Sequence, residues 1–160
     1  MRTRTIIDEE AFVSRVAKLA SLSSRTDARR AIRATLLELG ERLSAGDRAH
    51  FADVLPERWA GLIRTTEYRG AFGAGELFAR VSEREGAPLA SAREHVQAVC
   101  RVIAERAPVE SLARIGRVFP EGIAALFRRP MPVEPARCYR LARRRRWHLP
   151  TSVTRVGSSG

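Results

Sequence analysis

The chain has 160 residues, 29 basic and 18 acidic side chains, a formal charge of +11 with neutral histidines, and 44% hydrophobic residues. This length suits one ordinary domain, and the composition is that of a globular protein. No stretch approaches the ~20 consecutive apolar residues of a membrane span, and Cys100 and Cys138 alone cannot form a disulfide framework. We therefore expect a cytoplasmic domain that does not enter a membrane.

The charge is concentrated at the C-terminal end. Residues 1–127 carry 20 basic and 17 acidic side chains, whereas residues 128–160 carry nine arginines and one acid, Glu134. Every basic residue except Lys18 is an arginine, which we interpret first as the codon bias of a GC-rich bacterial genome. The body is therefore expected to be nearly neutral and the C-terminal segment strongly basic.

The first predicted helix contains residues 12–16, and the second covers residues 28–43, where apolar residues recur at the helical period. Ser24 precedes the second helix with Asp27 three residues later, which predicts an N-cap. After a small-residue turn comes a third helix. Pro56 is then expected at the first position of a short fourth helix, where its missing N–H costs nothing. We expect Trp59 in this last helix to be buried.

A second set of helices repeats the first. Residues 28–63 match residues 92–127 without a gap at an offset of 64, and 11 of the 36 positions are identical. The repeat predicts a helix that begins near Ser91, with Glu94 three residues later and His95 on its surface. It also predicts that Phe119 is buried. Eight residues of the matched pattern are given structural roles: Glu41, Arg42, Pro56, Glu57, Glu105, Arg106, Pro120 and Glu121.

The predicted fold is all-α. Two tandem four-helix repeats, residues 8–65 and 75–128, are expected to pack face to face around one core as a single helical domain, residues 8–129. The glycine-containing segment of residues 64–75 joins them. Residues 130–160 form an arginine- and proline-rich tail that we expect to be disordered.

The doubled helical pattern resembles the bacterial and archaeal family called domain of unknown function 2267. The resemblance covers about residues 8–128 and rests on residues 12–16, the helix ending in Glu41-Arg42-Leu43, the Leu55-Pro56-Glu57 junction, and their repetition at residues 77–127. It implies an all-helical fold and no established activity. Some relatives are joined to CBS-type nucleotide-sensing modules, which hints at regulation, but no part of this chain resembles such a module.

The scarce reactive residues do not form a catalytic set, so we expect no catalytic residue, metal ligand or cofactor. His50 lies between Asp47 and Asp53 and could hold one side of a metal site, but no second His or Cys is near in sequence. A solvated helix face is the preferred interpretation. Cys100 aligns with Leu36 and is expected in the core.

The tail is the unusual chemical feature, because guanidinium groups alternate there with aromatic rings. This pattern suits nucleic acid, and the candidate contacts are Arg140, Arg143, Arg144, Arg145, Arg146 and Trp147. The competing interpretation is a disordered extension without specific function.

The leading hypothesis is a non-enzymatic protein-interaction or regulatory module with an unidentified protein partner, as a monomer or homodimer. Nucleic-acid binding through the tail is the alternative.

Overall fold

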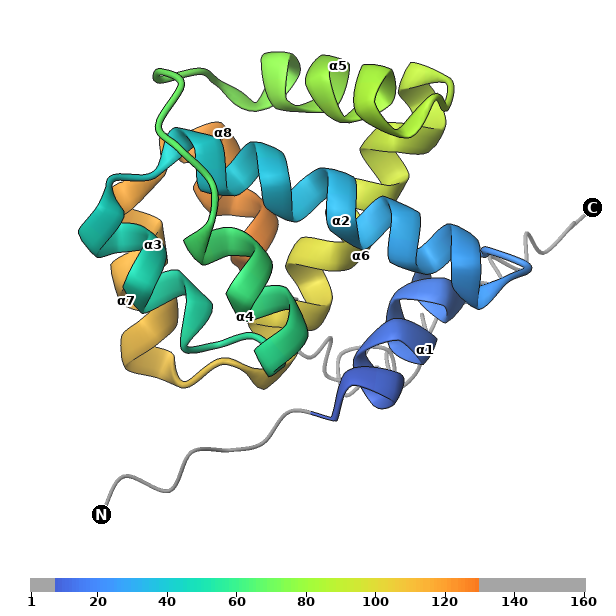
Figure 1. Ribbon diagram of the computed structural model, residues 1–160, viewed down its shortest axis with the longest axis horizontal. Helices are drawn as coiled ribbons and strands as arrows, with labels where there is room; N and C mark the ends of the chain where they lie inside the picture. Colours follow the sequence, from blue (N-terminus) through green and yellow to red (C-terminus); the bar gives the residue numbers. More distant parts are fainter. Residues whose placement is uncertain (1–7, 130–160) are drawn as a thin grey trace, which may run out of the picture. The chain divides into compact units, whose positions relative to one another are not determined.

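The computed structural model describes residues 8–129, and this part of the chain is all-helical, as predicted. Figure 1 shows its helices in chain order. Their bounds are α1 (Glu9–Leu19), α2 (Arg25–Arg42), α3 (Ala45–Ala52), α4 (Glu57–Arg64), α5 (Ala74–Glu85), α6 (Leu89–Arg106), α7 (Val109–Val118), α8 (Glu121–Ala124) and the 3-10 helix η1 (Ala125–Phe127). Between residues 8 and 129 there is no β-strand.

Side-chain caps start the first three helices. Asp8, Ser24 and Ser44 each accept a hydrogen bond from a backbone N–H of the first turn, at the beginning of α1, α2 and α3. The cap predicted at Ser24 is thus confirmed. Pro56 and Pro120 stand at the N-cap positions of α4 and α8, one residue earlier than predicted.

The cap predicted at Ser91 is wrong, although α6 begins near this residue. The helix begins at Leu89, and Ser91 lies inside its first turn rather than at its cap. The backbone explains the difference: Gly86 turns the chain with a φ of 70°, and the Pro88 carbonyl accepts the first helical hydrogen bond, 2.9 Å from the Ala92 nitrogen. The helix therefore starts without a hydroxyl cap.

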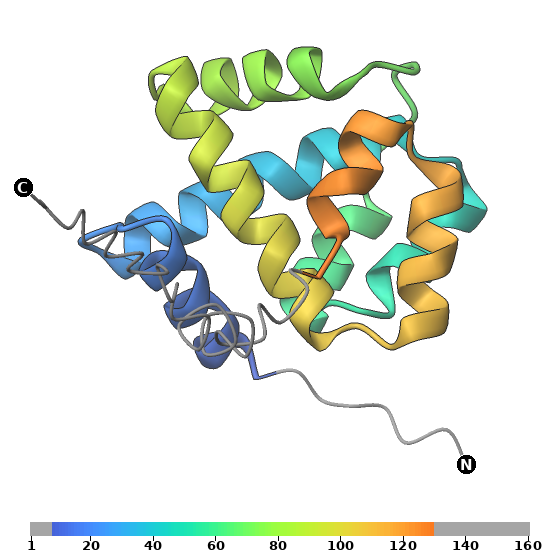
Figure 2. The ribbon, with the colours of Figure 1, turned by 180° about the vertical axis from the view of Figure 1, so that it is seen from behind.

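The two 18-residue helices, α2 and α6, run through the middle of the described body, and Figures 1 and 2 show this from opposite sides. The first helix, α1, packs against both of them, and so does α5. The shorter helices α3, α4, α7 and α8 gather around one end of this pair. Side chains from all eight α-helices and η1 contribute to one hydrophobic core. The internal sequence repeat itself remains a prediction.

Three aromatic rings join distant parts of this core. The ring of Phe51, in α3, meets the rings of Phe119 and Phe127 edge-on, with centroids 6.1 and 5.9 Å away. Phe119 and Phe127 stack at 5.7 Å. Such arrangements add to the free energy of burial. The predicted burial of Phe119 is confirmed.

The segment between α4 and α5 packs against the C-terminal end of α2. A Cβ atom at Gly40 would lie 2.5 Å from Oγ1 of Thr66, so glycine is required for this close approach. The Arg69 nitrogen donates to the Glu41 carbonyl oxygen at 2.6 Å, and Nε of Arg42 donates to the Phe72 carbonyl oxygen at 2.7 Å. These contacts hold the connection against the body.

Ion pairs tie the outer helices α1 and α5 to the central ones. Arg84, on α5, donates to Glu38 at 2.6 Å and to Glu41 at 2.9 Å, both on α2. Burial lowers the pKa of Arg84, but its hydrogen bond with Glu38 and the nearby carboxylates raise it overall. Arg15, on α1, donates to Glu105 on α6 at 3.0 Å, and this hydrogen bond lowers the pKa of the Glu105 carboxyl.

Candidate functional site

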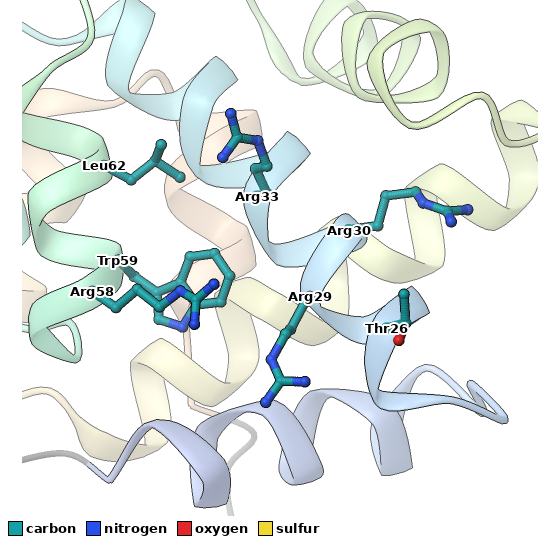
Figure 3. A pocket seen from close by; sticks show the side chains of 7 residues that line it. All are labelled: Thr26, Arg29, Arg30, Arg33, Arg58, Trp59 and Leu62. Carbon is teal, nitrogen blue, oxygen red and sulfur yellow. The ribbon is translucent and has the colours of Figure 1, made fainter.

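A pocket of about 290 Å³ lies beside α2 and α4 (Figure 3). Four of the seven side chains that line it are arginines. The lining residues are Thr26, Arg29, Arg30, Arg33, Arg58, Trp59 and Leu62. The lining thus combines concentrated positive charge with one aromatic and one aliphatic side chain.

Helical spacing brings the α2 residues of the pocket together. Thr26, Arg29, Arg30 and Arg33 are separated by three or four residues, which places them along one side of the helix. The opposite side of α2 is fully buried in the core. In Figure 3, Arg29 extends toward α1, whereas Arg30 points away from α4.

The α4 residues extend toward α2 from the other side of the pocket (Figure 3). Trp59 is 4% exposed, and its indole Nε1 is buried without a hydrogen-bond partner among the described residues. The guanidinium carbon of Arg58 lies 5.8 Å from the centre of a Trp59 ring. Burial of an unpaired N–H is costly, so this nitrogen lowers the stability of the fold and is not exposed to a ligand in the pocket.

Carboxylates surround only part of this arginine group. Glu10 pairs with both Arg25 and Arg29, and Asp27 pairs with Arg30 at 3.7 Å. Glu9, on α1, pairs with Arg58 at 3.4 Å. Arg33 has no acidic partner within residues 8–129. The four arginines of the lining and Arg25, which pairs with Glu10 outside the lining, thus face three carboxylates, and these eight side chains together carry a surplus of two positive charges.

The chemistry of this lining is that of recognition. Guanidinium groups present planar forks of N–H donors that match the oxygens of phosphate and carboxylate groups. The lining contains no histidine, cysteine or carboxylate that could act as a nucleophile or a general base. The arrangement can bind an anion and orient it.

The eight residues given structural roles are found at helix ends. Glu41 and Glu105 make the ion pairs with the outer helices described above, and Arg42 holds the connecting segment. Glu57 and Glu121 lie in the first turns of α4 and α8, paired with Arg64 and Arg128. Pro56 and Pro120 precede these helices, and Arg106 ends α6.

The reactive residues considered from the sequence lie apart from the pocket lining. His50 is exposed on α3, and no group of three or more His, Cys, Asp or Glu side chains within residues 8–129 could hold a metal ion. Cys100 is fully buried, as predicted, and burial raises the pKa of its thiol far above the ordinary value. It is therefore a core residue that stays protonated.

The surface position predicted for His95 is wrong. The residue is 7% exposed, and its Nδ1 lies 2.7 Å from a carboxylate oxygen of Glu85, in a geometry that does not make a hydrogen bond. Its own helix does not reveal this environment, because Glu85 comes from α5, which covers this side of α6.

The candidate nucleic-acid contacts Arg140, Arg143, Arg144, Arg145, Arg146 and Trp147 lie outside the described residues.

The pocket residues Arg29, Arg30, Arg33 and Arg58 were not predicted as a site. The sequence holds one feature that distinguishes them, because three pocket residues differ in type from their counterparts in the second repeat. At the offset of 64, Arg33, Arg58 and Trp59 align with Gln97, Gly122 and Ile123. The pocket chemistry is therefore specific to the first predicted repeat.

The fold and the pocket together define an all-helical protein with an arginine-lined surface site. The family model described as uncharacterized conserved protein (DUF2267) matches residues 9–126, and the chain belongs to this family. This agrees with the resemblance seen in the sequence. No curated protein matches the chain. Within residues 8–129, none of the helices has the length and apolar character required to cross a membrane.

Proposed function

We propose that the chain is a non-enzymatic interaction or regulatory module that binds an anionic group of its partner at the arginine pocket. The observation that carries this proposal is the lining of the pocket, since four of its seven side chains are arginines and one of them, Arg33, has no acidic partner within residues 8–129. The lining offers donors and positive charge, which favours binding over proton transfer. The proposed location is the bacterial cytoplasm, because the composition includes only two cysteines.

Thermal unfolding of the full chain tests whether the pocket binds anions at all. An anion that binds the folded state raises Tm, by a few degrees at concentrations well above its Kd. We expect sulfate or citrate at millimolar concentration to raise Tm by about 2 °C or more over chloride at equal ionic strength. A protein with Arg33→Gln and Arg58→Gln should lose at least half of this increase.

Arg93→Gln is the matched control for the thermal test. Arg93 is an exposed arginine on α6, outside the pocket lining, and it aligns with Arg29 in the predicted repeat. The arginines of residues 128–160 remain in all three proteins, so differences between them report the pocket. Equal anion effects in the unsubstituted protein and the doubly substituted protein would contradict the proposed function.

Nucleic-acid binding through the tail is kept as a second candidate. It is supported by the nine arginines of residues 128–160 and by the neighbouring Trp147. Its test compares chains with and without that segment and is described in the Discussion.

A further inference from the structure

We infer that the arginine pocket receives two neighbouring side chains of a partner protein, one acidic and one large and apolar. This inference rests on the proposed function, which requires only that an anion binds at the pocket. It adds the class of partner, a protein surface, and the two groups that this surface presents. Three properties of the pocket support it: the free charge of its lining, its apolar wall and its size.

Among the arginines that line the pocket, one has a charge that no acidic side chain balances within residues 8–129. Arg29, Arg30 and Arg58 each form an ion pair with a carboxylate of α1 or α2. Arg33 is exposed and has no acidic partner there. A single carboxylate balances one guanidinium group, and the two can bind through a pair of parallel hydrogen bonds. The free charge of the lining therefore favours one acidic side chain.

The wall of the pocket near Arg33 is apolar. Leu62, on α4, is half-buried and packs against the hydrophobic core, and Trp59 precedes it on the same helix. Figure 3 shows Arg33 at the same end of the pocket as Leu62, whereas Arg29 extends toward α1. An apolar side chain placed against Leu62 is removed from water, and such anchors in pockets supply much of the binding energy of protein interfaces. The pocket thus offers an apolar contact beside one free charge.

The same lining does not suit a nucleic acid. Its arginines point in different directions (Figure 3), and the carboxylates paired with three of them repel a run of phosphates. Trp59 is 4% exposed, so its ring presents no free face on which a base could stack. A protein surface sets apolar side chains beside single charges, which matches the lining.

The size of the pocket limits how much of the partner can enter it. Its volume is about 290 Å³, at the lower end of the range for small-molecule sites. A whole helix, which is roughly 10 Å across with its side chains, does not fit into this space. The main chain of the partner therefore stays outside, and only side chains from its surface enter.

Titration of the isotope-labelled full chain with short peptides, followed by NMR, tests the inference. The chain has two tryptophans, so a Trp147→Phe background leaves one indole N–H signal, that of Trp59 in the pocket lining. We expect acetyl-Phe-Glu-amide to shift this signal in a saturable manner. It should bind about fivefold or more tightly than acetyl-Ala-Glu-amide and acetyl-Phe-Gln-amide, which each lack one of the two groups. Both orders of the two residues are titrated, and the tighter one is used.

Two substitutions separate the acidic contact from the apolar one. Arg33→Gln should remove the preference for glutamate over glutamine and keep the preference for phenylalanine over alanine, whereas Leu62→Ala should do the reverse. Arg114→Gln removes an exposed arginine of α7 outside the lining and should leave both preferences unchanged. Thermal melts show whether each protein is folded. The Arg33→Gln comparison stands by itself if Leu62→Ala does not fold, because Arg33 is exposed and makes no ion pair within the described residues.

Four results would overturn the inference. If the alanine and phenylalanine peptides bind equally, the pocket takes an anion without an apolar anchor, and the proposed function survives. If Arg33→Gln keeps the preference for glutamate, the carboxylate binds elsewhere. If single-stranded oligothymidylate shifts the Trp59 signal more than the peptides do, and Arg33→Gln removes that shift, the ligand is a nucleic acid. If no peptide shifts the signal, the inference fails, and the thermal test with sulfate and citrate decides separately whether the proposed function fails with it.

Discussion

Trp59 connects the core of the protein with the pocket. The residue is 4% exposed and belongs to the same hydrophobic cluster as the central helices. It also lines the arginine pocket, where Arg58 lies over its ring. One side chain thus contributes both to the stability of the fold and to the shape of the candidate site.

Replacement of Trp59 by alanine should be strongly destabilising. The substitution removes a large buried side chain and leaves a cavity that the neighbouring helices can fill only in part. We expect the free energy of unfolding to fall by about 3–5 kcal/mol, measured by urea denaturation.

Trp59→Phe is the matched control for this stability prediction. It keeps an aromatic ring in the core, so it should cost less than alanine, and it also removes the buried, unpaired indole N–H. A loss below ~1 kcal/mol in the alanine variant would show that the ring contributes little to the core.

Single residues were predicted well where hydrophobic periodicity decides their position. Trp59, Cys100 and Phe119 are buried as expected, because apolar side chains at the helical period face the core. His95 was misplaced for a physical reason. A histidine beside a glutamate in sequence is typical of a solvated face, and the α5 residues that cover it come from another helix.

At the scale of elements, α5 depends on charged contacts for its position on α2. Only Leu77 and Val81 of this helix are buried, so its apolar contribution is small. Its Arg84 joins Glu38 and Glu41, and Arg80 lies 3.8 Å from Glu38. Glu38 is 3% exposed, so the positive charges of these arginines are needed to offset the cost of burying its carboxylate.

Arg84→Gln should therefore destabilise the protein. The substitution leaves two neighbouring carboxylates of α2 with weaker compensation, although Arg80 remains near one of them. Because Arg84 is partly exposed to solvent, we expect a loss of about 1–3 kcal/mol, measured by urea denaturation.

Arg114→Gln serves as the control on α7, where an exposed arginine has no ion pair within residues 8–129. Its effect should stay within about 0.5 kcal/mol. If the two glutamine variants are equally stable, the ion cluster does not hold α5 in place.

Helices could be predicted more reliably than their boundaries or their mutual contacts. Ser24 marks the start of α2 correctly, whereas the start of α6 depends on Pro88 and on the turn at Gly86. The pocket was not predicted, because arginines spaced by three or four residues usually indicate a solvated face. The α2 arginines form a pocket only together with Arg58 and Trp59, which the packing of α4 against α2 brings beside them.

At the scale of the whole molecule, two basic regions must be distinguished. One is the arginine pocket of the folded body, and the other is the segment of residues 128–160, which carries nine of the 29 basic side chains. A measured affinity for any polyanion contains contributions from both. Removal of one region at a time separates them.

A chain truncated after Arg129 tests the nucleic-acid hypothesis. If about six tail arginines contact phosphates, affinity of the full chain for single-stranded nucleic acid should fall roughly 300-fold between 50 and 200 mM salt. The truncated chain should bind far more weakly and with a smaller salt dependence, as measured by fluorescence anisotropy.

The full chain with Arg33→Gln controls for the pocket in this comparison. It should retain the affinity of the unsubstituted chain for nucleic acid, since its tail is intact. Equal affinities of the full and truncated chains would exclude the tail as a nucleic-acid interface.

The sequence indicates the all-helical class and the family, because helical periodicity and the doubled pattern extend over most of residues 8–128. It does not indicate how the outer helices are distributed. The face-to-face packing of two halves stays a prediction, and the contacts of α1 with α6 and of α5 with α2 run between those halves. That distribution depends on long-range pairs such as Arg15 with Glu105.

The position of α1 against α6 has a consequence for biosynthesis. Arg15 and Glu105 are 90 residues apart, so α1 leaves the ribosome long before part of its binding surface is made. At roughly 5–20 residues per second, this delay lasts on the order of 5–20 s. During that time, the apolar side chains of α1, which include Phe12 and Val16, lack one of the two helices that bury them. The surface that buries α1 is therefore complete only after translation has passed α6.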